Sequence, residues 1–335
     1  MKSFEIQEFG IENLVLADRP EPEPGAREVL VRLKAASLNY RDLMLVQGTY
    51  NPKLKRPLVP LSDGVGVVEK TGARVTRFRP GDRVAGCFFQ QWIDGPNTKE
   101  KGRSALGGAV DGVAREYAAF SEDGLVALPA FLTDEQAASL PCAAVTAWHA
   151  LFEERPVLPG ETVLLLGTGG VSIFALQLAV LAGLRVIITS SSDAKLAHAK
   201  ALGAHLTINY KATPEWGEEA RKLTGGEGVD HVVEVGGSDT MAHSLRAVRT
   251  HGTISVIGAL SGREGGISPA AVLMNSVRMQ GIYVGSRAMF EHLLRAIELH
   301  GLQPVIDRTF PFADLKSALL YLESKQHFGK ICLKF

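Results

Sequence analysis

Residues 162–195 hold the pattern with the clearest chemistry in this chain of 335 residues. An apolar run at 163–166 is followed by the turn Gly167-Thr168-Gly169-Gly170 and by a further apolar stretch. This order predicts a buried strand, a sharp turn and a helix, and a second apolar run at 184–189 predicts the next strand. Glycine suits such a turn, because it permits the reversal and lets the backbone approach a phosphate.

The turn is therefore interpreted as the pyrophosphate site of a dinucleotide. Gly167 would make the tight reversal, Gly169 would allow the close approach, and the first amides of the helix, at Gly170 and Val171, would face the anion. Ser172 stands where the pattern usually has a third glycine, and serine is small enough to fit there.

The end of the second strand favours a phosphorylated dinucleotide. A site for NAD usually has Asp or Glu about 20 residues beyond the glycines, but this chain has Ser190 and Ser191 there. Without a carboxylate to repel a 2′-phosphate, and with Lys195 close by to pair with one, the sequence predicts NADPH. The alternative is that Ser192 or Asp193 caps the next helix and that Lys195 is a solvated charge.

The composition narrows the class of protein. The chain is 46% apolar and 21% charged, and its formal net charge is zero. A neutral balance without a basic block argues against nucleic acid or membrane surfaces as partners, and no apolar run is long enough to span a bilayer. Three separated cysteines suit reduced thiols. We expect a cytoplasmic protein with a small-molecule substrate.

The predicted elements change in kind along the chain. Short strands and turns fill the first 120 residues, with strands expected at 29–35, 64–70, 83–88 and 116–120. Helices are expected from 134 and around 143–152. From there strands alternate with helices, which predicts a doubly wound parallel sheet of six strands. The six expected strands contain Val163, Val186, Leu206, His231, Thr253 and Gly281. Helices at 291–300 and 313–324 and a closing strand end the chain, and this tail is expected to return to the first domain.

Over nearly its full length the chain resembles the medium-chain dehydrogenase/reductase superfamily. The matching segments are the turn at 79–84, the helix segment at 143–147, the glycine turn at 167–172, residues 200–204 and the ending Phe328-Gly329-Lys330. The resemblance implies a GroES-like catalytic domain at 1–123 and 288–335, a Rossmann domain at 124–287 and an active-site cleft between them. It also implies dimers or tetramers, and of these we expect a homodimer.

The resemblance departs from zinc-dependent members at the metal ligands. Asn39 stands at the first ligand position, Ser62-Asp63 replaces the His-Glu pair, and only Cys142 remains in register. These residues cannot supply the three protein ligands of a catalytic zinc, so we expect no metal.

In the residues that replace the metal ligands, the chain resembles the quinone oxidoreductase and enoyl reductase branch. In that branch the loop with Asn39 and the Gly-x-Tyr ending at Tyr50 line the nicotinamide pocket, and a tyrosine at the position of Tyr210 lies beside the adenosine phosphate. Further expected cofactor contacts are Thr146, the strand-end glycines Gly236, Gly258 and Gly285, and Lys330.

The resulting hypothesis is reduction of a quinone or an α,β-unsaturated carbonyl without a metal. The Asn39 amide would donate to the carbonyl oxygen or fix the nicotinamide ribose, and Tyr50 would donate a hydrogen bond or a proton. Tyr40 and Asp42 are second candidates. The plain alternatives are that Asn39 stabilises a turn, that Tyr50 is packing, and that Asp42 caps a helix beginning at Leu43.

Three rival functions remain open at this point. One is an alcohol or aldehyde dehydrogenase with an unrecognised metal site, another is an enoyl-thioester reductase, and the third is a non-catalytic NADPH-binding protein. The apolar residues Tyr283 and Val284, expected in the final strand of the sheet, suggest extension of that sheet across a dimer.

Overall fold

The computed structural model describes residues 1–258 and 267–335, and the chain divides into two compact units. Residues 1–145 and 284–335 form the first unit, and residues 146–283 form the second. Residues 124–145, expected in the second domain, lie in the first unit, because strand β7 (Leu125–Ala127) pairs with β5 (Arg83–Gly86) and helix α3 (Asp134–Ala138) packs on the neighbouring strands. Residues 284–287 also lie in the first unit.

A seven-stranded sheet forms the centre of the first unit. Its order is β14-β15-β3-β4-β5-β7, with β6 also paired to β3, and all pairs except β14 with β15 are antiparallel. Strands β1 and β2 form a separate antiparallel pair. The four strands expected in the first 120 residues are confirmed. The remaining bounds are β1 Lys2–Ile6, β2 Leu14–Asp18, β3 Glu28–Ser37, α1 Tyr40–Val46, β4 Asp63–Thr71, α2 Lys99–Gly102, β6 Tyr117–Ser121, α10 Arg287–His300, β14 Ile306–Pro311, α11 Leu315–Glu323 and β15 Lys330–Lys334.

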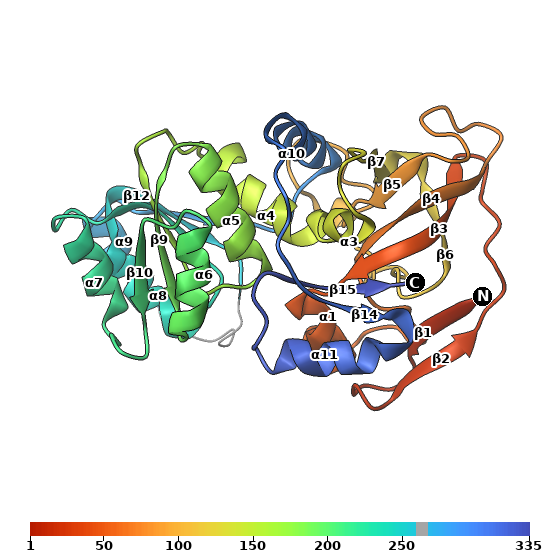
Figure 1. Cartoon of the computed structure of the whole chain (residues 1–335), viewed down its shortest axis with the longest axis horizontal. Helices are drawn as coiled ribbons and strands as arrows, with labels where there is room; N and C mark the ends of the chain where they lie inside the picture. Colours follow the sequence, from red (N-terminus) through yellow and green to blue (C-terminus); the bar gives the residue numbers. More distant parts are fainter. Residues whose placement is uncertain (259–266) are drawn as a thin grey trace. The chain divides into compact units, whose positions relative to one another are not determined.

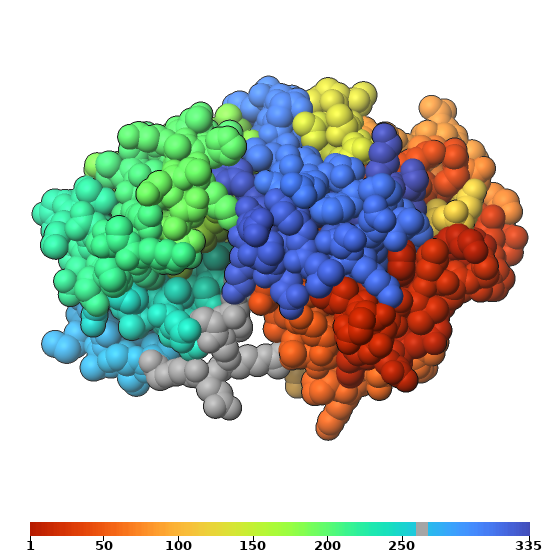
Figure 2. All heavy atoms as spheres, turned by 60° about the horizontal axis from the view of Figure 1, so that its bottom comes forward, coloured from red at the N-terminus to blue at the C-terminus, as the bar shows by residue number. Residues whose placement is uncertain are grey.

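The C-terminal segment returns to the N-terminal strands, as the sequence predicted. Strand β15 pairs with β3, with Cys332 opposite Ser37, and α11 packs against α1. Figure 2 shows the blue C-terminal residues lying against the red N-terminal ones. The buried side chains of α11, β15, β3 and α1 share one apolar core, so the tail completes the unit.

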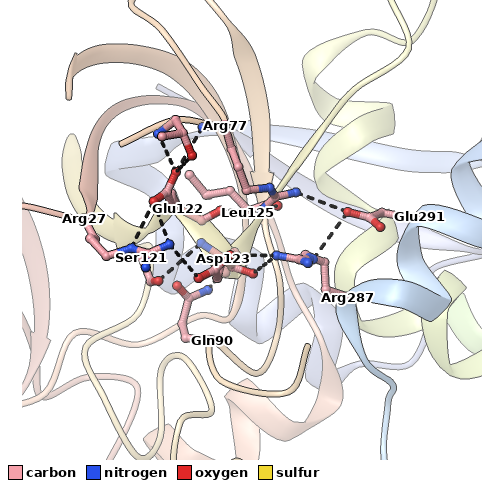
Figure 3. A network of polar contacts seen from close by, with 11 residues as sticks. Arg27, Arg77, Gln90, Ser121, Glu122, Asp123, Leu125, Arg287 and Glu291 are labelled. Atoms are coloured by element: carbon pink, nitrogen blue, oxygen red, sulfur yellow. Dashed lines mark hydrogen bonds and ion pairs between the residues drawn. The ribbon is translucent and has the colours of Figure 1, made fainter. Parts of the chain in front are cut away.

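Helix α10 is held to the first unit by a network of charges (Figure 3). The Arg287 guanidinium donates to Asp123 (Nη1 to Oδ1, 3.1 Å), and Arg77 donates to Glu291 (Nη2 to Oε1, 3.2 Å). The carboxylate of Glu122, whose side chain is fully buried, accepts from the backbone amides of Thr76 and Arg77 at 2.8 and 3.0 Å. The hydrogen bonds from the backbone amides of Thr76 and Arg77 hold the pKa of Glu122 below its ordinary value. The network explains why α10 belongs to this unit.

The second unit contains the six-stranded parallel sheet that the sequence predicted. Its order is β10-β9-β8-β11-β12-β13, and Figure 1 shows these strands flanked by helices. The order reverses beside β8, so the carboxyl ends of β8 and β11 form the switch point where such sheets bind ligands. The bounds are α4 Val145–Trp148, β8 Thr162–Leu165, α5 Gly170–Leu181, β9 Arg185–Ser190, α6 Asp193–Ala201, β10 Leu206–Asn209, α7 Trp216–Leu223, β11 Val229–Glu234, α8 Ser238–Ala247, β12 Val248–Val256, α9 Pro269–Met274 and β13 Arg278–Gly281.

Two expected details of the elements are wrong. Strand β13 ends at Gly281, so Tyr283 and Val284 lie beyond the sheet, and Val284 has a positive φ of 53° that no strand residue adopts. Helix α1 begins at Tyr40 rather than at Leu43. Among the described residues, no helix is long and apolar enough to cross a membrane.

Candidate active site

The turn between β8 and α5 leaves its backbone open. Gly167 has a φ of 72°, which glycine adopts without strain, and no atom lies within 4 Å of where a Cβ of Gly167 or Gly169 would stand. Helix α5 begins after Gly169 with no side-chain cap and no acidic residue in its first turn. The Ser172 hydroxyl, at the place of the third glycine, donates to the Leu166 carbonyl at 2.7 Å. The turn thus has the open backbone that a pyrophosphate would need, and a pyrophosphate site here stays a prediction.

Helix α8, which follows the adjacent strand β11, shows the opposite arrangement. The fully buried Glu234 carboxylate, at the end of β11, accepts from the amides of Gly236 (2.7 Å) and Gly237 (3.1 Å). The hydroxyls of Thr240 and Ser244 also donate to it. A carboxylate therefore already satisfies the amino end of α8, whereas that of α5 is open to an external anion.

At the corner after β9 the structure brings together most of the residues predicted to select the cofactor. Ser190 is buried, its hydroxyl accepts from the Ser192 amide (3.3 Å), and its carbonyl accepts from the Tyr210 amide (3.1 Å). The Tyr210 side chain is 40% exposed. The Ser192 hydroxyl accepts from the Lys195 amide at 3.4 Å, so the capping alternative is confirmed for Ser192.

An acidic residue, Asp193, also lies at this corner. Asp193 is the first residue of α6, and its Oδ1 accepts from Asn209 Nδ2 at 2.7 Å. The carboxylate is exposed and hydrogen-bonded to the end of β10. A sequence pattern places Asp193 in the right region but does not show which partner holds it.

The remaining predicted cofactor contacts lie in different places. Gly236 and Gly258 follow β11 and β12 by two residues, and a Cβ at Gly258 would lie 1.9 Å from the Val235 carbonyl oxygen, so this glycine is also required for packing. Thr146 is buried at the start of the second unit. Gly285 lies in the first unit, where a Cβ would lie 2.6 Å from Val145 Cγ1.

In the first unit, Asn39 directly precedes α1 and has an extended backbone. Its backbone N–H donates to Asp42 Oδ2 at 2.8 Å. Asp42 is therefore the third residue of the helix and does not cap a later one. The carboxyl is fully buried, its Oδ1 accepts no hydrogen bond, and burial raises the pKa of Asp42 to about 6 against the opposing charge of Arg41.

Asn39, Ser62, Asp63 and Lys330 form a closed set of polar contacts, which we call the polar ring. Lys330 Nζ donates to Asn39 Oδ1 (2.7 Å) and to the Leu38 carbonyl (2.7 Å), and it lies 3.9 Å from Asp63 Oδ2. Asn39 Nδ2 lies 3.5 Å from Ser62 Oγ, and this hydroxyl donates to Asp63 Oδ1 at 2.6 Å. Ser62, Asp63 and Lys330 are buried. The ammonium of Lys330 thus faces the Asn39 loop.

The two candidate tyrosines are partly buried against the apolar core of the first unit. The Arg41 guanidinium carbon lies 5.5 Å from the centre of the Tyr50 ring and 4.7 Å from that of Phe88, and Nη1 donates to the Leu106 carbonyl at 3.0 Å. A Cβ at Gly108 would lie 2.2 Å from Arg41 Nη2, so glycine makes room for this side chain. Sequence reasoning missed Arg41, because its position next to Asp42 gives no sign that it turns inward onto aromatic rings.

Comparison with known proteins places the chain in a family. Residues 25–130 match the model of the alcohol dehydrogenase GroES-like domain, and residues 170–298 match that of the zinc-binding dehydrogenases. A zinc-type alcohol dehydrogenase-like protein of Schizosaccharomyces pombe is 48% identical over 92% of this chain and 90% of its own length. The chain belongs to the medium-chain dehydrogenase/reductase superfamily. It is an oxidoreductase of that superfamily.

Other members of the superfamily differ in the activity their names give. An acryloyl-coenzyme A reductase of Sulfurisphaera tokodaii is 27% identical over 95% of this chain and 96% of its own. A solved structure of a putative alcohol dehydrogenase from Sinorhizobium meliloti is 42% identical, with a TM-score of 0.94 over 100% of this chain and 98% of that one. A mycobacterial protein complexed with NADPH is 27% identical, with a TM-score of 0.83 over the full length of both chains.

The zinc in the family's name does not fit the residues of this chain. Asn39 Oδ1, at the position that the resemblance gives to the first ligand, accepts from the Lys330 ammonium, and the same cation lies 3.9 Å from Asp63 Oδ2. Burial raises the pKa of the Cys142 thiol well above its ordinary value, which disfavours the thiolate that zinc requires. Within residues 1–258 and 267–335, no three His, Cys, Asp or Glu side chains lie close enough together to hold a metal ion.

Proposed function

We propose that the protein is an NADPH-dependent, zinc-independent oxidoreductase that reduces a quinone or a carbon–carbon double bond conjugated to a carbonyl group. The observation that carries this proposal is the polar ring, in which a buried lysine contacts Asn39 and Asp63 and the Ser62 hydroxyl donates to Asp63. The resemblance puts Asn39, Ser62 and Asp63 where zinc-dependent members have metal ligands. In zinc-dependent members a Lewis acid lowers the pKa of the alcohol for oxidation, and this site does not supply the three protein ligands that a catalytic zinc requires.

Reduction of a conjugated acceptor has different requirements. Bound NADPH would supply the hydride, and negative charge would develop on the acceptor oxygen as an enolate or a phenolate. The chain must then provide hydrogen-bond donors for that oxygen and a proton. Asn39 Nδ2 is such a donor, because the amide oxygen is already held by Lys330. Tyr50, with Arg41 beside its ring, is the candidate for the second donor or the proton, and Tyr40 and Asp42 remain the second candidates.

The second unit supports the cofactor assignment. The open amino end of α5 suits a pyrophosphate, and Ser190 and Ser191 present no carboxylate to repel a 2′-phosphate. Lys195 and the exposed Tyr210 lie at the same corner. We therefore assign NADPH, and we place its adenosine phosphate beside Ser190.

An enoyl thioester is the second candidate substrate. The acryloyl-coenzyme A reductase among the relatives favours it, because its name describes the reduction of a conjugated thioester and it spans almost the whole chain. The chemistry required of Asn39 is the same, since the thioester carbonyl also becomes an enolate.

We also propose that the protein forms a homodimer in the cytoplasm. Helix α9, which comes just before the outer strand β13 in the chain, carries exposed apolar side chains: Leu273 is 78% exposed and Met274 is 81% exposed. Apolar side chains so fully exposed are typical of a surface that another chain covers.

The test is NADPH oxidation with a panel of acceptors: a quinone, a 2-alkenal, a cyclic enone, an enoyl thioester and a saturated aldehyde. The proposal expects turnover with conjugated acceptors and none with the saturated aldehyde, and the ranking of the first four decides between free and thioester substrates. Turnover of the saturated aldehyde alone would overturn it in favour of an alcohol dehydrogenase.

A further inference from the structure

Lys330 has a definite place in the fold of the first unit. Gly329, at a φ of 77°, directs the chain into β15, and a Cβ there would lie 2.6 Å from the Val305 carbonyl oxygen. The first contact of β15 with the end of β3 is the bond from the Leu38 amide to the Ile331 carbonyl, at 3.0 Å. The side chain of Lys330 therefore begins next to the Asn39 loop. Lys330 as a whole residue is only 3% exposed.

The contacts of this ammonium decide the orientation of the Asn39 amide. A lysine ammonium has donors and no acceptor, so the atom that faces it at 2.7 Å must be the amide oxygen. The reversed amide would place two donors against each other in a buried site. The two N–H groups of Asn39 must consequently point away from Lys330.

The rest of the polar ring agrees with this direction. The Ser62 hydroxyl gives its proton to Asp63 Oδ1, so its lone pair is what faces Asn39 Nδ2. The other oxygen of Asp63 accepts from the Cys142 amide at 3.1 Å and the Ser37 hydroxyl at 3.4 Å. Both oxygens of Asp63 therefore accept hydrogen bonds, and the Lys330 ammonium lies beside this carboxylate as its counter-ion.

We propose that Lys330 is a positioning residue: its buried ammonium, paired with Asp63, fixes the Asn39 amide so that the N–H not directed at Ser62 is offered to the acceptor oxygen. The inference rests on the proposed function. Lys330 acts through Asn39 and does not itself touch the substrate. The role differs from the cofactor contact expected for Lys330 from the sequence, because the ammonium is already engaged by Leu38, Asn39 and Asp63.

The first experiment observes the contact itself. In protein labelled with 15N-asparagine, the side-chain amide resonances of Asn39 are assigned by their loss in Asn39→Ala. They should shift in Lys330→Met and stay in place in Lys334→Met, which removes an exposed lysine from the same strand. An Asn39 amide that is unchanged in Lys330→Met would overturn the inference, and this result does not depend on knowing the substrate.

The second experiment measures the consequence with the best conjugated acceptor. Asn39→Ala should lower kcat by about 100-fold, the usual loss for one oxyanion donor, and Lys330→Met should have an effect of the same order. If Lys330 works through Asn39, the double variant should also lose about 100-fold and not the product of about 10⁴. The Kd of NADPH should change by less than about threefold in each variant. Multiplying losses, or a weakened Kd with unchanged kcat, would contradict a positioning role.

Lys330→Met leaves Asp63 as an unpaired buried charge, so the variant can fail to fold. The double variant Lys330→Met/Asp63→Asn removes both charges and replaces the single variant in that case. It should show the same shift of the Asn39 side-chain amide resonances and the same loss of kcat. Wild-type turnover in either folded double variant would also overturn the inference. If wild-type protein reduces none of the acceptors, the proposed function fails, while the amide resonance still tests the contact between Lys330 and Asn39.

Discussion

Asn39 combines two tasks that sequence reasoning treats as alternatives. Its backbone amide donates to Asp42 and starts α1, which is the structural task, while its side chain belongs to the polar ring. The residue can therefore begin a helix and still offer a donor for chemistry. The same holds for Asp42, whose Oδ2 stabilises the helix start while the buried Oδ1 accepts no hydrogen bond and lies 3.8 Å from Arg41 Nη1.

Tyr50 gives the first prediction at the scale of the residue. Tyr50→Phe should lower kcat at least about tenfold if the phenol donates a proton or hydrogen bond, with the Kd of NADPH almost unchanged. Steady-state kinetics and fluorescence titration of NADPH provide the two values. Tyr117→Phe, a partly buried tyrosine on β6, is the matched control. Unchanged turnover in both Tyr50→Phe and Asn39→Ala would refute the assignment of these residues.

Asp42 gives the second prediction. Burial raises its pKa from 3.8 to about 6, so the folded protein keeps a proton that the unfolded chain releases near pH 4. Stability must then fall as the pH rises from 4 to 7, by at most about 3 kcal/mol. Asp42→Asn cannot ionise, and its amide oxygen can still accept from the Asn39 amide.

The variant should therefore be more stable than the wild type above pH 7, and this advantage should disappear below pH 4. Urea unfolding at pH 4, 6 and 8 measures the difference. An advantage of Asp42→Asn that is the same at all three values would show that the carboxyl does not titrate in the way proposed.

At the scale of the element, the corner formed by β9, α6 and β10 selects the dinucleotide. Ser190→Asp would place a carboxylate beside the proposed 2′-phosphate, and it should lower kcat/KM for NADPH about 10–100-fold while sparing NADH. Lys195→Ala should act in the same direction, and Lys200→Ala, an exposed lysine on the same helix, is the control. A wild-type enzyme that already prefers NADH would contradict the assignment, and would direct attention to Asp193.

These elements also show how far the sequence leads. The glycine turn and the parallel strands follow from local patterns of glycine and apolar residues, which can be recognised without tertiary contacts. The end of β13 and the start of α1 were placed wrongly, because positive φ at Val284 and the hydrogen bond between Asn39 and Asp42 are not visible in periodicity.

Only part of the candidate site could be identified from the sequence. Asn39, Ser62 and Asp63 could be singled out by what they replace. That Lys330, 291 residues further along, closes the polar ring depends on the pairing of β15 with β3, and no local pattern specifies that pairing. The sequence likewise does not show that the buried Glu234 side chain accepts hydrogen bonds from the start of α8.

At the scale of the whole molecule, the proposed dimer is testable by sedimentation. The wild type, with a chain mass of 36.0 kDa, should sediment as a species of twice that mass. Met274→Glu, which puts a charge on the exposed apolar face of α9, should shift it toward the monomer. A wild-type monomer at micromolar concentration would contradict the proposal, and a dimer indifferent to Met274→Glu would place the interface elsewhere.

The most direct test of the account is turnover of a conjugated acceptor by enzyme from which metals have been removed. Metal content is measured before and after extended dialysis against a chelator, and NADPH oxidation is then followed with the best acceptor of the panel. The polar ring predicts full activity with less than one tenth of a zinc per chain, and no gain when zinc is returned. Activity that disappears on chelation and returns with stoichiometric zinc would show that Asn39, Asp63 and Cys142 hold a metal after all.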